Sequence, residues 1–262
     1  MPEPRSSREP CRPVPDGDAL LQEAAGADMA GLAAMRLRHE AGEPAPYLAG
    51  FFTFCGHRFL IDRRAYITDP ELVHLLKAVE DEGSRIEAAS GRAPRLLEFG
   101  IGAGTLSITL KLAHPDWEFH GIDIDPLALE VAVENARLHR VSLHLLQSDF
   151  FSAWPRGAAA PDLIFGDPPW GGPEDLYDKT RDAAYYEKMP KLSAFPGGDN
   201  PCAIHDRLIL EASALGWPSE LVLNFGVLPL PLIERSAAPL ASWRLLNPGA
   251  SLSILLGKLR GL

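Results

Sequence analysis

An acid, two prolines and a tryptophan directly follow an apolar run in residues 163–170, Leu-Ile-Phe-Gly-Asp-Pro-Pro-Trp. The apolar run is typical of a buried strand, and the prolines cannot continue a sheet because they lack a backbone N–H. The strand must therefore end in a rigid, extended loop. This loop carries the carboxylate of Asp167, the carbonyl of Pro168 and the ring of Trp170, which are groups able to orient an amine. The stretch predicts a site for amine alkylation.

A second stretch with chemical potential, residues 98–104, has glycines at alternate positions, Gly100, Gly102 and Gly104. It lies between a predicted strand and a predicted helix, and its glycines let a ligand approach the peptide groups closely. The spacing is not the Gly-x-Gly-x-x-Gly of dinucleotide sites, and no Lys-Ser/Thr follows as in a P-loop. Glu98 at the strand end would repel phosphates and favour a cation. We therefore expect a ligand with a positive charge and no pyrophosphate anchor.

Carboxylates follow the next two predicted strands. Asp123 lies roughly 20 residues past the last glycine, where an acid in such folds accepts hydrogen bonds from both ribose hydroxyls. Asp149 follows the next strand and either accepts a hydrogen bond from an adenine amine or caps residues 150–154. The glycines alone could merely tighten a turn, and Asp123 could cap the helix at Pro126, a task for which Asp125 is better placed. Together, at successive strand ends, these groups predict an adenosyl ligand with a positively charged tail.

The composition indicates which kinds of binding partner and which cellular compartment to expect. The 262 residues, 46% of them hydrophobic, can form one sizeable domain with a small appendage. The net charge of −10 and the absence of any basic run argue against a nucleic-acid partner. The scattered cysteines and the lack of metal-ligand spacing among the histidines predict a reduced, cytoplasmic protein without a metal. No segment is apolar enough to span a bilayer or to form a signal peptide.

The elements that must position these groups are arranged asymmetrically along the chain. Residues 1–18 predict a disordered tail because they are polar and rich in proline. Residues 19–68 predict a small N-terminal subdomain with two short helices broken near Gly26 and a β-hairpin around residues 55–57. Residues 69–262 predict the ligand-binding domain, which begins with a helix capped by Asp69.

Strands and helices alternate after Pro94. Strands are expected at 95–99, 117–122, 142–146 and 162–165, with helices at 105–113 and 126–138. This alternation with short connections predicts an α/β fold with a doubly wound, mostly parallel sheet, which binds ligands at the carboxyl ends of its strands. A long polar loop to about residue 200, a helix at about 201–215, and strands at 221–225, 243–245 and 251–256 complete the domain.

These motifs resemble those of the class I S-adenosylmethionine-dependent methyltransferases, and more narrowly the HemK/PrmC type that methylates a glutamine side chain of peptide release factors. The resemblance extends from about Tyr47 to the C-terminus. It includes the glycine stretch, Gly-Ile-Asp-Ile-Asp-Pro at 121–126, Asn-Ala at 135–136, Asp149-x-Phe151 and the Asp167 loop. It implies a Rossmann-like fold with S-adenosylmethionine as cofactor. The implied pocket is lined by Glu98, Gly100, Gly102, Asp123, Asp149 and Asp167, to which we add Gly104, Ile124 and Phe150 as neighbours.

Two positions depart from the family pattern at the predicted reacting centre. The family has Asn where this chain has Asp167, and Tyr where it has Trp170. An Asn offers one donor and one acceptor, which match a primary amide, whereas a carboxylate only accepts and suits an amino group better. We therefore expect Asp167 and the Pro168 carbonyl to orient a nitrogen and Trp170 to stack on the substrate or pack on the core. An Asp at its ordinary pKa is a poor base, so proton acceptance by Asp167 is a secondary role.

The long loop after Trp170 contains Tyr177, Tyr185 and Tyr186 and is either ordinary surface or a lid over the cofactor. Tyr185 and Tyr186 are the candidate substrate contacts.

Three functions remain open at this point. The first is an N-methyltransferase for a small amine, an amino-acid-like molecule or a protein side chain. The second is a cyclase in which the cofactor's own amine, held by Asp167, attacks its γ-carbon and releases methylthioadenosine, leaving azetidine-2-carboxylate. The third is a non-catalytic cofactor-binding module, which the intact Asp167 loop disfavours. DNA adenine methylation uses a similar loop, but the acidic composition counts against it.

Overall fold

The computed structural model describes residues 16–176, 183–193, 195–249 and 252–261. Most of the predicted disordered tail, and the predicted lid residue Tyr177, lie outside these residues. The end of the tail was predicted too late, because Asp16 already caps a helix that begins at Gly17. Its side chain accepts a hydrogen bond from the backbone N–H of Ala19 at 2.8 Å.

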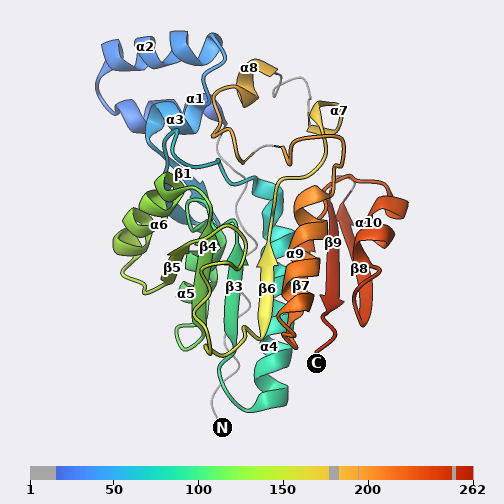
Figure 1. Ribbon diagram of the computed structural model, residues 1–262. Coiled ribbons are helices and arrows are strands. Elements are labelled where there is room, and N and C mark those ends of the chain that lie inside the picture. Colours follow the sequence, from blue (N-terminus) through green and yellow to red (C-terminus); the bar gives the residue numbers. More distant parts are fainter. Residues whose placement is uncertain (1–15, 177–182, 194, 250–251, 262) are drawn as a thin grey trace.

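A mixed sheet of 7 strands forms the centre of the described chain, in the order β5-β4-β3-β6-β7-β9-β8 (Figure 1). The strands β5, β4, β3, β6 and β7 pair in parallel, and β9 pairs antiparallel with β7 and with β8. This confirms the expected doubly wound, mostly parallel class. The strands are β3 (Arg95–Phe99), β4 (Glu118–Asp123), β5 (His144–Gln147), β6 (Leu163–Gly166), β7 (Glu220–Asn224), β8 (Ser242–Gly249) and β9 (Leu252–Lys258).

Helices cover both faces of the sheet because successive strand residues point to opposite sides. One face packs against α4 (Val73–Ser90), α5 (Thr105–Ala113) and α6 (Pro126–His139). The other packs against α9 (Ala203–Ala214) and α10 (Leu230–Ala237). In β3, Leu96 belongs to the first core and Leu97 to the second. A strand buried on both faces reads as a continuous apolar run, as the sequence of β6 does, whereas β3 is interrupted by the buried Glu98.

The structure corrects several local predictions. The helix expected at Asp69 begins with a 3₁₀ turn, Pro70–Leu72, and the Asp69 side chain makes no capping hydrogen bond. The short helices α3 (Ala45–Ala49), α7 (Pro173–Leu176) and α8 (Ala183–Tyr186) and the longer α10 were not predicted. They are too short or too rich in proline to show a clear helical period.

The N-terminal segment divides between two cores. Helices α1 (Gly17–Ala25), α2 (Met29–Glu40) and α3 enclose a small apolar cluster of their own. The hairpin β1 (Phe51–Phe54) and β2 (His57–Leu60) instead contributes three phenylalanines to the core of α4, α5 and α6. Figure 1 shows α1–α3 with α7 and α8 above the carboxyl ends of the parallel strands.

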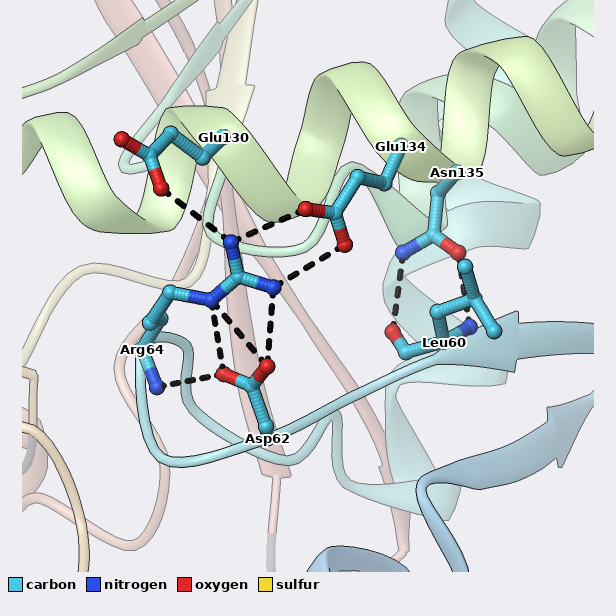
Figure 2. Close-up of polar contacts among 6 residues, drawn as sticks. All are labelled: Leu60, Asp62, Arg64, Glu130, Glu134 and Asn135. Atoms are coloured by element: carbon cyan, nitrogen blue, oxygen red, sulfur yellow. Dashed lines mark hydrogen bonds and ion pairs between the residues drawn. The ribbon is translucent and has the colours of Figure 1, made fainter.

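One buried amide ties the hairpin to the glycine turn, and Figure 2 shows its two hydrogen bonds with Leu60 of the hairpin. Asn135 on α6 accepts a hydrogen bond from the Leu60 N–H at 2.7 Å and donates to the Leu60 carbonyl at 3.0 Å. It also donates to the carbonyl of Ala103, in the glycine stretch, at 3.0 Å. Asn135 is fully buried, so each bond satisfies a backbone group that water reaches poorly.

An arginine beside the hairpin links it to α6 a second time. Arg64 contacts Asp62 at 2.8 Å, Glu134 at 2.9 Å and Glu130 at 3.1 Å, as Figure 2 shows. These carboxylates raise the pKa of the Arg64 guanidinium further above its ordinary value, with Asp62 as the largest cause. The group is partly exposed, so we assign it to orientation of the segment after β2 and give it little weight in stability.

The cysteines depart from the expectation that all are reduced. Cys55, in the hairpin turn, is disulfide-bonded, whereas Cys202 is a free, buried thiol. Spacing along the chain does not determine which thiols meet in the fold. No helix in the described part of the chain combines the length and apolarity needed to cross a membrane.

Replacement of Asn135 by Ala should lower the free energy of unfolding by about 2–4 kcal/mol, because it leaves three backbone groups without partners. Arg137→Ala, at an exposed position of the same helix, should change it by less than about 0.5 kcal/mol. Urea denaturation of both variants measures the difference. Equal effects would show that the amide does not connect the hairpin to the turn.

Candidate active site

A cavity of about 270 Å³ opens at the carboxyl ends of β3, β4 and β6. The chain leaves β3 toward β4 and β5 on one side and returns through β6 and β7 on the other, so the strand order reverses here. Ligands of open α/β sheets bind at this reversal. Seven of the predicted cofactor residues line the cavity: Gly100, Gly102, Asp123, Ile124, Asp149, Phe150 and Asp167.

The glycine turn is built around a carboxylate of the neighbouring strand. Gly100, Gly102 and Gly104 have φ values of 66°, 54° and 78°, a region that favours glycine. The Gly102 N–H donates to Asp123 Oδ2 at 2.9 Å, and the N–H of Asp125 donates to Oδ1 at 3.0 Å. Burial raises the pKa of Asp123, against these hydrogen bonds. Asp123 therefore anchors the turn and still lines the cavity.

Asp125, and not Asp123, caps the helix that follows β4. Asp125 is the N-cap of α6, and its side chain accepts from the Leu127 N–H at 2.9 Å. The Gly102 and Asp125 N–H groups bind separate oxygens of Asp123, which leaves lone pairs available to a ligand hydroxyl.

Two predicted residues lie behind the cavity wall. Glu98 is 3% exposed and accepts a hydrogen bond from the Ser107 N–H at 3.0 Å, at the start of α5. Gly104 contacts α5 and α6, where an added Cβ would lie 3.1 Å from Ile108 Cδ1. Neither lines the cavity among the described residues. Burial raises the pKa of Glu98 to about 8, with smaller contributions from Asp123 and Asp167.

The predicted adenine side of the cavity contains an ion pair over an aromatic ring. Arg207 of α9 contacts Asp149 through two hydrogen bonds of 3.0 and 2.8 Å. Its guanidinium lies 3.9 Å from the centroid of Phe150, whose ring packs against Phe99 at 5.0 Å. Asp149 is thus held by an arginine of α9, a contact that neither sequence-based alternative included. The ring of Phe150 supplies an apolar wall.

Asp167 is enclosed at the end of β6 and held by an amide from β7. Asn224 Nδ2 donates to Asp167 Oδ1 at 2.7 Å, and Asn224 Oδ1 accepts from the Gly226 N–H at 2.9 Å. Burial raises the pKa of Asp167 to about 7, and the hydrogen bonds from Asn224 and Trp170 oppose the rise. A carboxyl group with a pKa near 7 can accept a proton at neutral pH. Proton acceptance by Asp167, predicted from the sequence to be secondary to orientation of a nitrogen, is therefore a realistic role.

A second cavity, of about 180 Å³, lies beyond Asp167. It is lined by Asp167, Pro168, Trp170 and Tyr186 among others, so Asp167 borders both cavities. Trp170 lies so close to the backbone of Gly226 that an added Cβ would be 2.0 Å from its ring. The ring therefore packs on the β7 end and lines the cavity as well.

The two predicted substrate tyrosines differ in position. Tyr186 is buried and lines the second cavity, and its hydroxyl donates to the Leu176 carbonyl at 3.3 Å. Tyr185 contacts the Tyr186 ring at 5.4 Å and is absent from the described linings of both cavities.

Sequence reasoning missed several wall residues. Asn224 carried a signal, since it ends a strand of the same sheet as Asp123 and Asp167 do. The first cavity is also lined, from other elements, by Arg64, Tyr66, Ile204 and Arg207. The only hint for the loop residues that line it was the length of their loop; these residues are Pro190, Leu192, Ser193, Phe195 and Pro196. Their positions depend on packing between segments that are distant in sequence.

Comparisons with known proteins agree with this geometry. Residues 77–181 match the family model described as methyltransferase small domain. A release factor glutamine methyltransferase of Deinococcus radiodurans is 31% identical over 210 residues, which are 78% of this chain and 67% of that protein. The protein of the same name in Enterococcus faecalis is 27% identical over 66% of this chain and 58% of its own length. The chain thus spans just over half the length of the latter.

Solved structures show the same fold at low identity. The catalytic domain of hMettl16 in complex with an RNA hairpin superposes with a TM-score of 0.58 at 13% identity, over 77% of this chain and 74% of that one. A 16S rRNA N2 G1207 methyltransferase of Thermus thermophilus gives a TM-score of 0.53 at 19% identity, over 80% and 50% of the two chains. Both comparisons concern the fold alone.

Asp167→Asn should stabilise the ligand-free protein increasingly as the pH rises from 4 to 8. Folding raises the pKa of Asp167, so its carboxyl group stabilises the folded state fully only at a pH below its pKa in the unfolded chain. This stabilisation is lost as the pH rises through about 7. At pH 8 the gain should be on the order of 2–4 kcal/mol. Urea denaturation at several pH values measures it, with the exposed Asp116→Asn as a control expected to show no trend. A pH-independent effect of Asp167→Asn would contradict the assignment.

Proposed function

We propose that this chain, which belongs to the HemK/PrmC-like family of class I S-adenosylmethionine-dependent methyltransferases, methylates a nitrogen atom of an amine or amide acceptor. The observation that carries the proposal is the position of Asp167. Its carboxyl borders both the cavity predicted to hold the cofactor and the adjoining cavity, and it titrates near neutral pH.

The first cavity has groups that fit S-adenosylmethionine. Asp123 can accept hydrogen bonds from the ribose hydroxyls, and Phe99, Ile122 and Phe150 offer apolar surface to the adenine. The glycine turn offers backbone groups to the cationic amino-acid end, near the enclosed carboxyl groups. Once bound, the cofactor supplies a methyl group attached to a sulfonium, which is already a good leaving group.

The second cavity is the proposed acceptor site. A nitrogen placed there meets Asp167 and the Pro168 carbonyl, both of which accept N–H bonds and so aim its lone pair toward the first cavity. Ionised Asp167 can also take the proton that an amine loses on methylation. The neutral form offers a donor and an acceptor, as the Asn of the family does, so an amide acceptor remains compatible with this site below neutral pH.

The charge and the relatives bear on the acceptor class. The net charge of −10 favours a cationic small molecule or a protein side chain over a nucleic acid. The relatives carry the name release factor glutamine methyltransferase, so a release factor is one acceptor to test.

Cyclisation of the cofactor is the second candidate, because Asp167 lines the cofactor cavity itself and could hold the cofactor's own amine. The separate cavity beyond Asp167 favours transfer to another molecule.

Mass spectrometry of the adenosyl product separates these functions. The protein is incubated with S-adenosylmethionine alone, then with a panel of amines and amino acids, and then with a purified release factor. We expect S-adenosylhomocysteine only when an acceptor is present. Methylthioadenosine together with azetidine-2-carboxylate, formed from the cofactor alone and faster than without protein, would establish the cyclase and refute methyl transfer. The absence of turnover with every acceptor would support a non-catalytic module.

Asp123→Asn should weaken S-adenosylhomocysteine binding by roughly 10- to 100-fold, a loss of about 1.4–2.8 kcal/mol, because the turn loses its anchor and the ribose an acceptor. Isothermal titration calorimetry measures the dissociation constant. Asp116→Asn is the exposed control. Unchanged affinity in Asp123→Asn would place the cofactor elsewhere.

Asp167→Asn should remove one ionisation from the pH profile of methyl transfer to an amine. In the native protein kcat/KM includes a limb that falls about tenfold per pH unit below pH 7, as Asp167 becomes protonated. The acceptor's own ionisation cancels in the ratio of native to variant rates. This ratio should fall as the pH drops from 8 to 5, and a constant ratio would show that the proton goes elsewhere.

A further inference from the structure

Two histidines and a glutamate meet on an edge of the sheet, outside the proposed active site. Glu118 and His120 are two residues apart on β4, so they point to the same face. His144 on β5 is the register partner of His120. Each residue can offer one ligand atom, a carboxylate oxygen from Glu118 and an imidazole nitrogen from each histidine. These three atoms lie within 4.8 Å of one another.

The contacts around this cluster leave one carboxylate oxygen directed at the histidines. Arg95 Nη2 lies 3.0 Å from Glu118 Oε2, whereas His120 Nε2 lies 2.7 Å from Glu118 Oε1. The rings of His120 and His144 stack with centroids 4.7 Å apart and an angle of 24°. The arginine thus fixes the carboxylate from behind, as groups that support metal ligands do.

The surroundings give a ligand access to the cluster. A cavity of about 430 Å³ adjoins it, and all three residues line this cavity together with Trp154 and Pro155. His144 is exposed, whereas Glu118 and His120 are partly buried. His120 and His144 start from paired backbone positions of two strands, and Glu118 lies two residues before His120 on the same strand.

We propose that Glu118, His120 and His144 bind a divalent transition-metal cation, with zinc as the reference ion. Two imidazoles and one carboxylate are a donor set that suits zinc and neighbouring first-row metals, whereas magnesium and calcium prefer oxygen ligands. The cation replaces the hydrogen between His120 and Glu118 Oε1, and the Arg95 contact to Oε2 remains. A fourth position stays open toward the cavity.

The proposed site departs from the expectation from sequence that the histidines have no metal-ligand spacing. Glu118 and His120 are separated by one residue, and His144 is 24 residues beyond His120. Only the parallel register of β4 and β5 brings the second imidazole opposite the first.

The cation has a structural consequence that does not depend on methyl transfer. It would join β4 to the four-residue edge strand β5 through side chains, in addition to the backbone ladder. A ligand that binds only the folded state stabilises it, so zinc should raise the temperature of thermal unfolding.

The test uses the full chain without an affinity tag, treated with EDTA and then freed of the chelator. Isothermal titration with zinc chloride should show one cation per chain, and cobalt chloride should give the visible absorption of a site with nitrogen ligands. His144→Ala and His120→Asn should weaken zinc binding at least tenfold and abolish the zinc-dependent rise in unfolding temperature. His74→Ala, an exposed histidine on α4, is the matched control and should leave both unchanged.

Circular dichroism confirms that each variant is folded before titration. Absence of zinc binding to the native chain would overturn the proposal. So would an affinity that is unchanged in both His144→Ala and His120→Asn, because the cation would then be bound by other groups.

Discussion

The burial of several carboxyl groups at one edge of the sheet is the constraint on which the site depends. Glu98, Asp123 and Asp167 end neighbouring parallel strands, and burial raises the pKa of all three. Such groups are costly to ionise together in a medium of low dielectric constant. A cationic ligand relieves this cost, so the same burial that destabilises the empty site at high pH favours a sulfonium cofactor and an amine acceptor.

The strand ends and the glycine turn could be predicted because their signals are local. Thr105–Ala113 is a helix with the expected bounds, and β3 spans the expected residues. Side chains that end parallel strands must meet at one edge, which placed Asp123 and Asp167 together before the structure was known. Asn224 obeys the same rule, but the predicted strand at 221–225 placed it inside the strand, whereas β7 ends at Asn224.

The rest of the site could not be predicted because it arises from packing between distant segments. Arg207 reaches Asp149 across 58 residues, and Asn135 reaches Leu60 of the hairpin across 75. The roles of Glu98 and Gly104 differ from expectation for the same reason. Their types fit the cofactor chemistry, but the packing of α5 and α6 places them behind the wall.

The most direct test of the account is the pKa of Asp167 in the folded, cofactor-free protein. It can be measured from the pH dependence of the carboxyl ¹³C resonance, assigned by its absence from the spectrum of Asp167→Asn. The account predicts a midpoint near 7 that falls when S-adenosylmethionine binds, because the cation favours the carboxylate. A midpoint near the ordinary value of 3.8, unchanged by the cofactor, would contradict it.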